Sequence, residues 1–241
     1  NWTSYRTILE FGRETYESKV KSLIGDYKTA IVTFGRTGAE GASPSLDYDG
    51  NGDTTTGRHY LELSENEKDL LEFCSENFDS TIVLINSAVA METGFIDNPD
   101  YNIDAAIWMG HPGEAGVLGV ADILAGNVNP SGHLVDTYAY DMSTTPSFWS
   151  ANDQTYSNID NGNSGRKYYE YNEGIYVGYR YYETADAEGY FDSDEFENIL
   201  WKGNLSSADK YTEGTDYAAM KTAGPQIKYS GYDEVVQYPF G

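Results

Sequence analysis

Three short runs of β-branched and apolar residues alternate with helix-like segments, and this alternation constrains the fold more than any other feature of the sequence. The runs span residues 29–34, 81–85 and 105–109. Continuous apolar runs of this kind are typical of parallel strands that are buried on both faces. We therefore predict three neighbouring central strands with helices on both faces of the sheet. The predicted fold class is α/β, a mainly parallel-sheet α/β sandwich of three layers.

Helical patterns surround these runs. Residues 5–24 show amphipathic spacing, which predicts a helix before the first strand. Ser64 and Glu67 fit a capping box at the start of a second helix. Cys74, the single cysteine, lies on the apolar face of that helix, and we interpret it as a buried filler rather than a nucleophile. Residues 114–125 are apolar almost all round, which predicts a buried helix.

The character of the chain changes after the third run. Residues 133–138 are predicted to form a further strand, and residues 175–182 also have a strand-like composition. Residues 183–234 are acidic with weak periodicity. We therefore expect a sandwich domain over residues 1–182, an acidic insertion or small subdomain over 183–234, and a return to the sandwich domain over 235–241.

A long polar connection links the first strand to the helix that begins at Ser64. It opens with the sequence Gly-Arg-Thr-Gly-Ala-Glu-Gly at residues 35–41. Connections of this length are usually functional or disordered. Ligands of open α/β sheets bind beyond the carboxyl ends of the strands, where Glu40 would emerge. Glu40 is therefore the leading candidate for chemistry, and the alternative is a solvated loop glutamate in an acidic protein.

The charge of the chain excludes some classes of partner. The formal net charge is −24, which repels nucleic-acid phosphates and anionic membrane surfaces. The apolar runs are too short to span a bilayer. We expect neither a nucleic-acid nor a membrane partner.

No motif indicates a metal or another cofactor. Residues 47–53 resemble the first half of a calcium loop, but Arg58 stands where the loop requires a glutamate. We therefore interpret this segment as a polar turn. The three histidines, His59, His111 and His133, lack the spacing of metal ligands. The sequence therefore predicts no metal site and no cofactor.

Several blocks, found in the same order, resemble the second, α/β-sandwich domain of glycoside hydrolase family 3. They are Gly-His-Pro-Gly-Glu-Ala-Gly at 110–116, Val-Ala-Asp-Ile-Leu-Ala-Gly at 120–126, Asn-Pro-Ser-Gly-His-Leu at 129–134 and Tyr-Asn-Glu-Gly-Ile-Tyr-Val-Gly-Tyr-Arg-Tyr-Tyr at 171–182. Tyr-Pro-Phe-Gly at 238–241 adds a short fifth match. Each block alone is short, but together they are specific.

The resemblance implies a β-glucosidase-like, exo-acting enzyme that retains anomeric configuration. In this family the nucleophilic Asp lies in a separate (β/α)8 barrel, and in many members a loop of the sandwich domain supplies the acid/base Glu. The family motif, an Arg followed by small residues and Glu-Gly, matches the segment from Arg36 to Gly41 and implies that Glu40 is the acid/base. The implied partners are the barrel of the same parent chain and a glycoside or oligosaccharide substrate. Ser43 stands where related sequences often carry an Asp, which this chain first reaches at Asp47.

The resemblance leaves two further interpretations open. Because a retaining glycosidase needs two carboxyl groups, the chain without a barrel is expected to be inactive. The rival is a non-catalytic carbohydrate-binding or structural α/β module. An independent hydrolase would need a nucleophile, and Ser87 and Ser131 lack the elbow pattern of a hydrolase serine. Should Glu40 not be the acid, Glu92 and Glu114 are the next carboxylates near strand ends.

Overall fold

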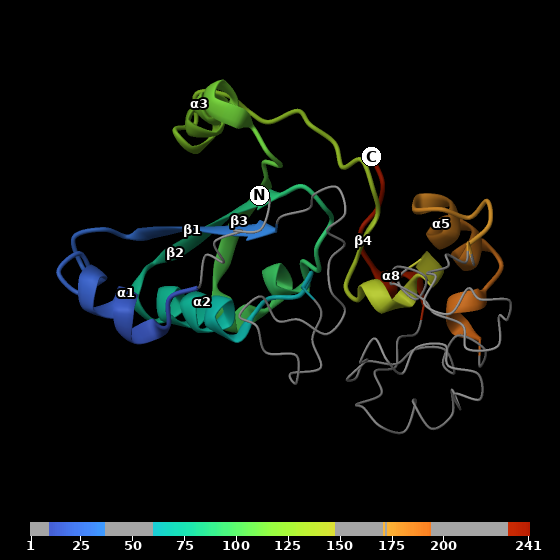
Figure 1. The fold of residues 1–241 in the computed structure, drawn as a ribbon, viewed down its shortest axis with the longest axis horizontal. Coiled ribbons are helices and arrows are strands. Elements are labelled where there is room, and N and C mark those ends of the chain that lie inside the picture. Colours follow the sequence, from blue (N-terminus) through green and yellow to red (C-terminus); the bar gives the residue numbers. More distant parts are fainter. Residues whose placement is uncertain (1–9, 37–59, 148–170, 172, 194–230) are drawn as a thin grey trace, which may run out of the picture.

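The computed structural model describes residues 10–36, 60–147, 171, 173–193 and 231–241 (Figure 1). Figure 1 shows two groups of elements. The first contains a parallel sheet with helices α1 (Arg13–Val20) and α2 (Glu65–Asn77). The second contains a small antiparallel pair of strands with helices α5 (Tyr179–Ala187) and α8 (Tyr232–Val235).

The parallel sheet has the order β1-β2-β3. Its strands are β1 (Thr29–Arg36), β2 (Ser80–Ser87) and β3 (Ile103–Trp108). In the observed register Val32 lies opposite Val83, and Leu84 lies opposite Ile107. The prediction that the three apolar runs are neighbouring parallel strands is confirmed, and with it the α/β class.

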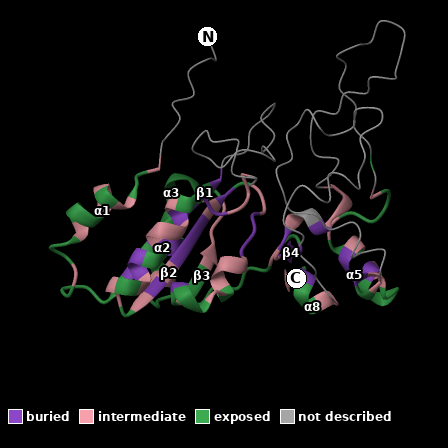
Figure 2. Cartoon of the chain, turned by 90° about the horizontal axis from the view of Figure 1, so that it is seen from below, coloured by how far each residue is buried: buried purple, intermediate pink, exposed green. Residues whose placement is uncertain are grey.

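The prediction that these strands are buried on both faces is wrong. Burial alternates along β1, so that Val32 is 5% exposed while Ile31 is 55% exposed. Figure 2 colours the described strands and helices by their burial. Residues 104–106 in the middle of β3 are also exposed. Successive side chains of a strand point to opposite faces, and the core of this sheet forms with α2 and α1 on one face. A continuous β-branched run shows which faces are apolar, but it does not show which face is covered.

Helix α2 forms as the sequence predicts. The Ser64 hydroxyl accepts a hydrogen bond from the Glu67 amide at 3.1 Å, and the Ser64 amide donates to the Glu67 carboxylate at 2.9 Å. This reciprocal pair completes the capping box. Leu71 and Cys74 point into the core shared with β1 and β2, which confirms Cys74 as a buried filler.

The burial of Cys74 has a measurable consequence for its reactivity. Burial raises the pKa of its thiol to about 11, and the residue is 4% exposed. Only the thiolate is nucleophilic, and an ordinary thiol has a pKa near 8.5. At pH 8 we expect a disulfide reagent such as Ellman's reagent to label the folded chain at least about 100-fold more slowly than free cysteine. The same chain in guanidinium should react at the rate of free cysteine, and equally fast labelling of the folded chain would contradict the buried position.

Helix α3 (Gly113–Leu124) has nearly the predicted bounds but not the predicted burial. Val120 is its only buried residue, and Leu118 is 68% exposed. Figure 1 shows α3 standing apart from the sheet rather than covering it. Its apolar composition describes the helix alone, whereas burial requires a surface to pack against. The expectation of helices on both faces of the sheet is therefore corrected for the described residues.

The second group of elements differs most from the sequence-based prediction. Strand β4 (Tyr138–Ala139) pairs antiparallel with β5 (Val236–Tyr238), so only the last residue of the predicted strand 133–138 is in a strand. The predicted strand at 175–182 is wrong, because helix α5 begins at Tyr179. Gly178 has a φ of +59°, a conformation that favours glycine and turns the chain into this helix.

The core of this second group joins its helices to its strands. Its buried residues are Ala139, Tyr182, Ala185, Phe191, Val235 and Val236. Short 3-10 helices complete the structure, at Gly94–Asp97, Pro99–Tyr101, Met142–Thr144 and Tyr190–Asp192. None of the helices in the described ranges is long and apolar enough to cross a membrane.

Hydrogen bonds join the two groups. Gln237 of β5 donates to the Thr93 carbonyl at 3.1 Å and to the Asp97 carboxylate at 2.8 Å. The Thr93 hydroxyl donates to the Gln237 side-chain oxygen at 2.7 Å. Tyr140, directly after β4, donates its phenol proton to the same Asp97 oxygen at 2.8 Å. Desolvation and this bond to Asp97 raise the pKa of Tyr140 to about 12.

Candidate functional site

The carboxyl ends of the three parallel strands form one edge of the sheet, where ligands of α/β proteins bind. Arg36 ends β1 and lies opposite Ser87, which ends β2. Trp108 ends β3, one strand further along. Arg36, with which the predicted motif begins, therefore lies at this edge.

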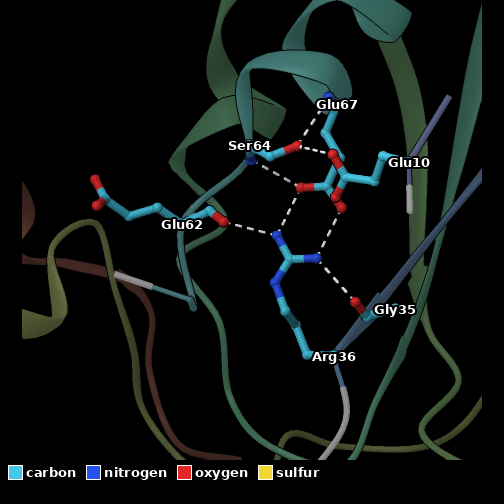
Figure 3. Close-up of polar contacts among 6 residues, drawn as sticks. All are labelled: Glu10, Gly35, Arg36, Glu62, Ser64 and Glu67. Atoms are coloured by element: carbon cyan, nitrogen blue, oxygen red, sulfur yellow. Dashed lines mark hydrogen bonds and ion pairs between the residues drawn. The ribbon is translucent and has the colours of Figure 1, made fainter. Parts of the chain in front are cut away.

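Arg36 forms the most extensive polar cluster at this edge (Figure 3). Its guanidinium donates through Nη1 to Glu67 Oε1 at 2.7 Å and through Nη2 to Glu67 Oε2 at 2.6 Å. The two side chains are only 4% and 10% exposed. Such a two-point ion pair fixes the orientation of the guanidinium as well as its position.

The same guanidinium also binds the backbone. Nη1 donates to the Gly35 carbonyl at 2.8 Å, and Nη2 donates to the Glu62 carbonyl at 2.6 Å. Its carbon lies 5.5 Å from the centroid of the Tyr60 ring. Burial alone would lower the pKa of Arg36, but the hydrogen bonds and charge of Glu67 outweigh it, so the pKa lies above its ordinary value. Arg36 is therefore a permanent buried cation held at four acceptor atoms.

Glu67 is held in turn by the start of α2. Its Oε2 accepts from the Ser64 amide, and the Ser64 hydroxyl also bonds to a carboxylate oxygen of Glu10 (Figure 3). The cluster thus links β1, the start of α2 and the segment before α1. The sequence indicated Arg36 as the start of a motif and Glu67 as a cap, but it did not indicate that the two bind each other.

The predicted acid/base Glu40 lies outside the described residues, as do residues 47–53 and His59. The other two histidines, His111 and His133, are exposed. In the part of the chain that the structure covers, no three His, Cys, Asp or Glu residues gather as a metal site would require.

The next candidate carboxylates are described, and they lie in different parts of the structure, Glu92 in the connection after β2 and Glu114 on α3. Glu92 is buried, and its carboxylate accepts from the Met142 amide at 2.9 Å. Glu114 is exposed in the first turn of α3. Ser87 is buried, and its hydroxyl donates to the Val89 carbonyl within its own turn. These contacts give Glu92 and Ser87 structural roles.

A cleft of about 370 Å³ lies beside β3. Its lining is mostly apolar and includes Ile103, Trp108, Tyr138 and Tyr238. Among the described residues Asp104 is the one carboxylate in the lining, and it accepts a hydrogen bond from the Thr81 amide at 3.1 Å. The described part of the lining therefore does not supply the pair of carboxyl groups that glycoside hydrolysis requires.

Comparison with known proteins identifies similar chains. The profile of the glycosyl hydrolase family 3 C-terminal domain matches residues 6–179. A β-glucosidase of Ruminococcus albus is 33% identical over 168 residues, which are 70% of this chain and 15% of that protein. Thermostable β-glucosidase B of Acetivibrio thermocellus is 34% identical over 134 residues, 56% of this chain and 16% of that protein.

A solved structure agrees with these matches. The β-glucosidase of Paenibacillus barengoltzii superimposes with a TM-score of 0.54 at 30% sequence identity. The match covers 69% of this chain and 16% of that one. The matched part of the chain thus corresponds to only 15% to 16% of the length of these three relatives.

Proposed function

The chain belongs to the family of glycosyl hydrolase family 3 C-terminal domains, and from this premise we propose that it acts as the second domain of a β-glucosidase-like enzyme. In this proposal the complete enzyme hydrolyses terminal β-linked sugars with retention of configuration. A separate barrel domain carries the nucleophile, and this chain contributes the acid/base carboxyl of Glu40. The observation that carries the proposal is the family match over residues 6–179, which includes β1 and the motif that begins at Arg36.

The chemistry explains why a second domain is needed. A retaining glycosidase uses two carboxyl groups about 5 to 5.5 Å apart. One attacks the sugar, and the other first protonates the leaving oxygen and later deprotonates water. The acid must hold its proton near neutral pH, and a nearby ionised carboxylate raises its pKa. Glu40 would gain such a neighbour from the nucleophile of the barrel.

The position of Arg36 supports this assignment. Arg36 ends β1 at the carboxyl edge of the sheet, and Glu40 follows it by four residues. Ligands of α/β folds bind outside this edge. A carboxylate on the following segment is thus available to reach a sugar held between the two domains.

We expect the purified 241-residue chain to have no glycosidase activity. Neither carboxyl group can perform the other's step, so an acid/base without a nucleophile gives no turnover. The measurement is aglycone release from aryl β-glucosides, with the complete enzyme at equal molarity as the positive control. Turnover by the isolated chain that disappears on mutation of one of its own residues would contradict the proposal.

A further inference from the structure

We infer that Arg36 is a positioning residue. Its buried guanidinium holds the residues on either side of the segment 37–59 close together. The contacts that carry this inference lie entirely among described residues on both sides of that segment. Its effect on catalysis rests on the function proposed for Glu40. The holding of the two ends does not rest on that proposal.

One side chain reaches both ends of the segment. Arg36 is the last residue of β1 and the last described residue before the segment. Its Nη2 donates to the Glu62 carbonyl at 2.6 Å, and its guanidinium carbon lies 5.5 Å from the Tyr60 ring centroid. Tyr60 and Glu62 are where the described chain resumes. The residues directly before and after the segment are therefore held together by one guanidinium.

The guanidinium is itself held from both sides. On one side its own strand pairs with β2, with Arg36 opposite Ser87. On the other side Glu67 binds it at two points, and the Ser64 amide fixes the same Glu67 oxygen at 2.9 Å. Arg36 thus joins the edge of the sheet to the first turn of α2. Both supports belong to packed elements, so the anchor is rigid.

The chemistry of the cluster requires arginine. A planar guanidinium can donate at once to Glu67, to Gly35 and to Glu62, whereas a lysine ammonium is a point charge that cannot match this fork. Buried ion pairs add little net stability compared with apolar residues of similar volume. A geometric role therefore accounts for this pair better than a stabilising role does.

The anchor limits where Glu40 can lie. Arg36 is the last described residue before the segment, and only three residues separate it from Glu40 in the sequence. Fixing Arg36 and residues 60–62 removes freedom at both ends of the segment. Displacement of a reacting group by about 1 Å can cost about 100-fold in rate. A loosened anchor should therefore affect the acid step most.

The test uses Glu67→Gln and Arg36→Lys in the complete enzyme. In Glu67→Gln an amide oxygen can still accept from Ser64, while the charge and the bond to Arg36 Nη1 are lost. Arg36→Lys keeps the buried positive charge but loses the planar guanidinium and its paired donors. Glu76→Gln is the matched control, because Glu76 also lies on α2 and pairs with an arginine, Arg13, at an exposed site.

Two measurements separate anchoring from stability and from the role of Glu40. We expect hydrogen exchange of amides 60–68, from the return end of the segment to the first turn of α2, to rise about tenfold or more in both variants, with amides of β2 unchanged. We also expect kcat to fall about tenfold or more for poor leaving groups and much less for good ones. Glu76→Gln should change neither quantity. Wild-type exchange over 60–68 in both variants would overturn the anchor, whatever Glu40 does.

The remaining outcomes also decide the matter. Faster exchange over 60–68 with unchanged kcat for every leaving group would overturn the positioning role. A kcat loss that is equal for good and poor leaving groups would overturn it as well. Should Glu40→Ala show no dependence on the leaving group, the proposed acid role would fail, while faster exchange in Glu67→Gln would still support the anchor.

Discussion

Glu40→Ala in the complete enzyme is expected to slow the hydrolysis of glycosides with poor leaving groups by about 10²- to 10⁴-fold, the usual contribution of general acid–base catalysis. Glycosides with good leaving groups should lose much less in the first step, because such groups depart without a proton. Their second step still lacks a general base, so azide, which needs none, should restore turnover. The product should be a glycosyl azide of retained configuration. The measurement is kcat against leaving-group pKa, with and without azide.

Glu114→Ala provides a matched control for this experiment. Glu114 is an exposed carboxylate in the first turn of α3, and its loss should leave both kinds of substrate unaffected. If Glu40→Ala slows good and poor leaving groups equally and azide rescues neither, Glu40 has a binding or structural role. The rival interpretation, a domain that stiffens the enzyme or holds sugar, would then be favoured. If instead Glu114→Ala slows poor leaving groups more than good ones, the acid is Glu114 on α3.

Val32→Asp is expected to destabilise the chain by about 3 to 5 kcal/mol, on the scale of an uncompensated buried charge. Val32 is 5% exposed and packs in the core that β1 shares with α2. The neighbouring Ile31 is 55% exposed on the opposite face. We expect Ile31→Asp to cost about 1 kcal/mol or less, which is the span of strand propensities. Urea unfolding of the two variants and the wild type gives both values.

The pair tests whether one face of the sheet is open. The two substitutions are adjacent in sequence and chemically alike, so effects on the unfolded chain nearly cancel. A loss of several kcal/mol for Ile31→Asp would contradict the one-sided packing and would mean that both faces of β1 are covered in solution. A small loss for Val32→Asp would contradict the core beneath α2.

Local patterns predicted most of what proved correct. The three strands are continuous apolar runs, and their parallel pairing follows from the helices between them. The start of α2 could be predicted because Ser64 and Glu67 are three residues apart and cap each other. The burial of Cys74 could be predicted from its place on the apolar face of that helix.

The errors concern contacts that no local pattern records. An apolar helix such as α3 has the same sequence whether or not another surface covers it, and here Leu118 is 68% exposed. The exposure of one face of β1 could not be predicted for the same reason. Further along, aromatic residues after Gly178 favour strand by propensity. Packing of Tyr182 and Ala185, three residues apart, favours a helix instead.

The candidate site was predictable in part for the same reason. The motif from Arg36 to Gly41 identified the segment, because its residues are consecutive. The partner of Arg36 lies 31 residues away at Glu67, and nothing in the sequence joins the two. The assignment of Glu40 remains a prediction that the Glu40→Ala experiment addresses.

The hydrogen bonds of Gln237 impose an order on folding during translation. Gln237 bonds to Thr93, which the ribosome makes 144 residues earlier. At about 5 to 20 residues per second, Thr93 waits about 7 to 30 s for this partner. Strands β1, β2 and β3 are complete by Trp108 and can pair in that interval, whereas β4 must wait for β5. Nascent chains halted far enough past residue 140 for β4 to have left the ribosome, but before β5 is made, should therefore protect the parallel sheet from proteolysis and leave β4 open to cleavage.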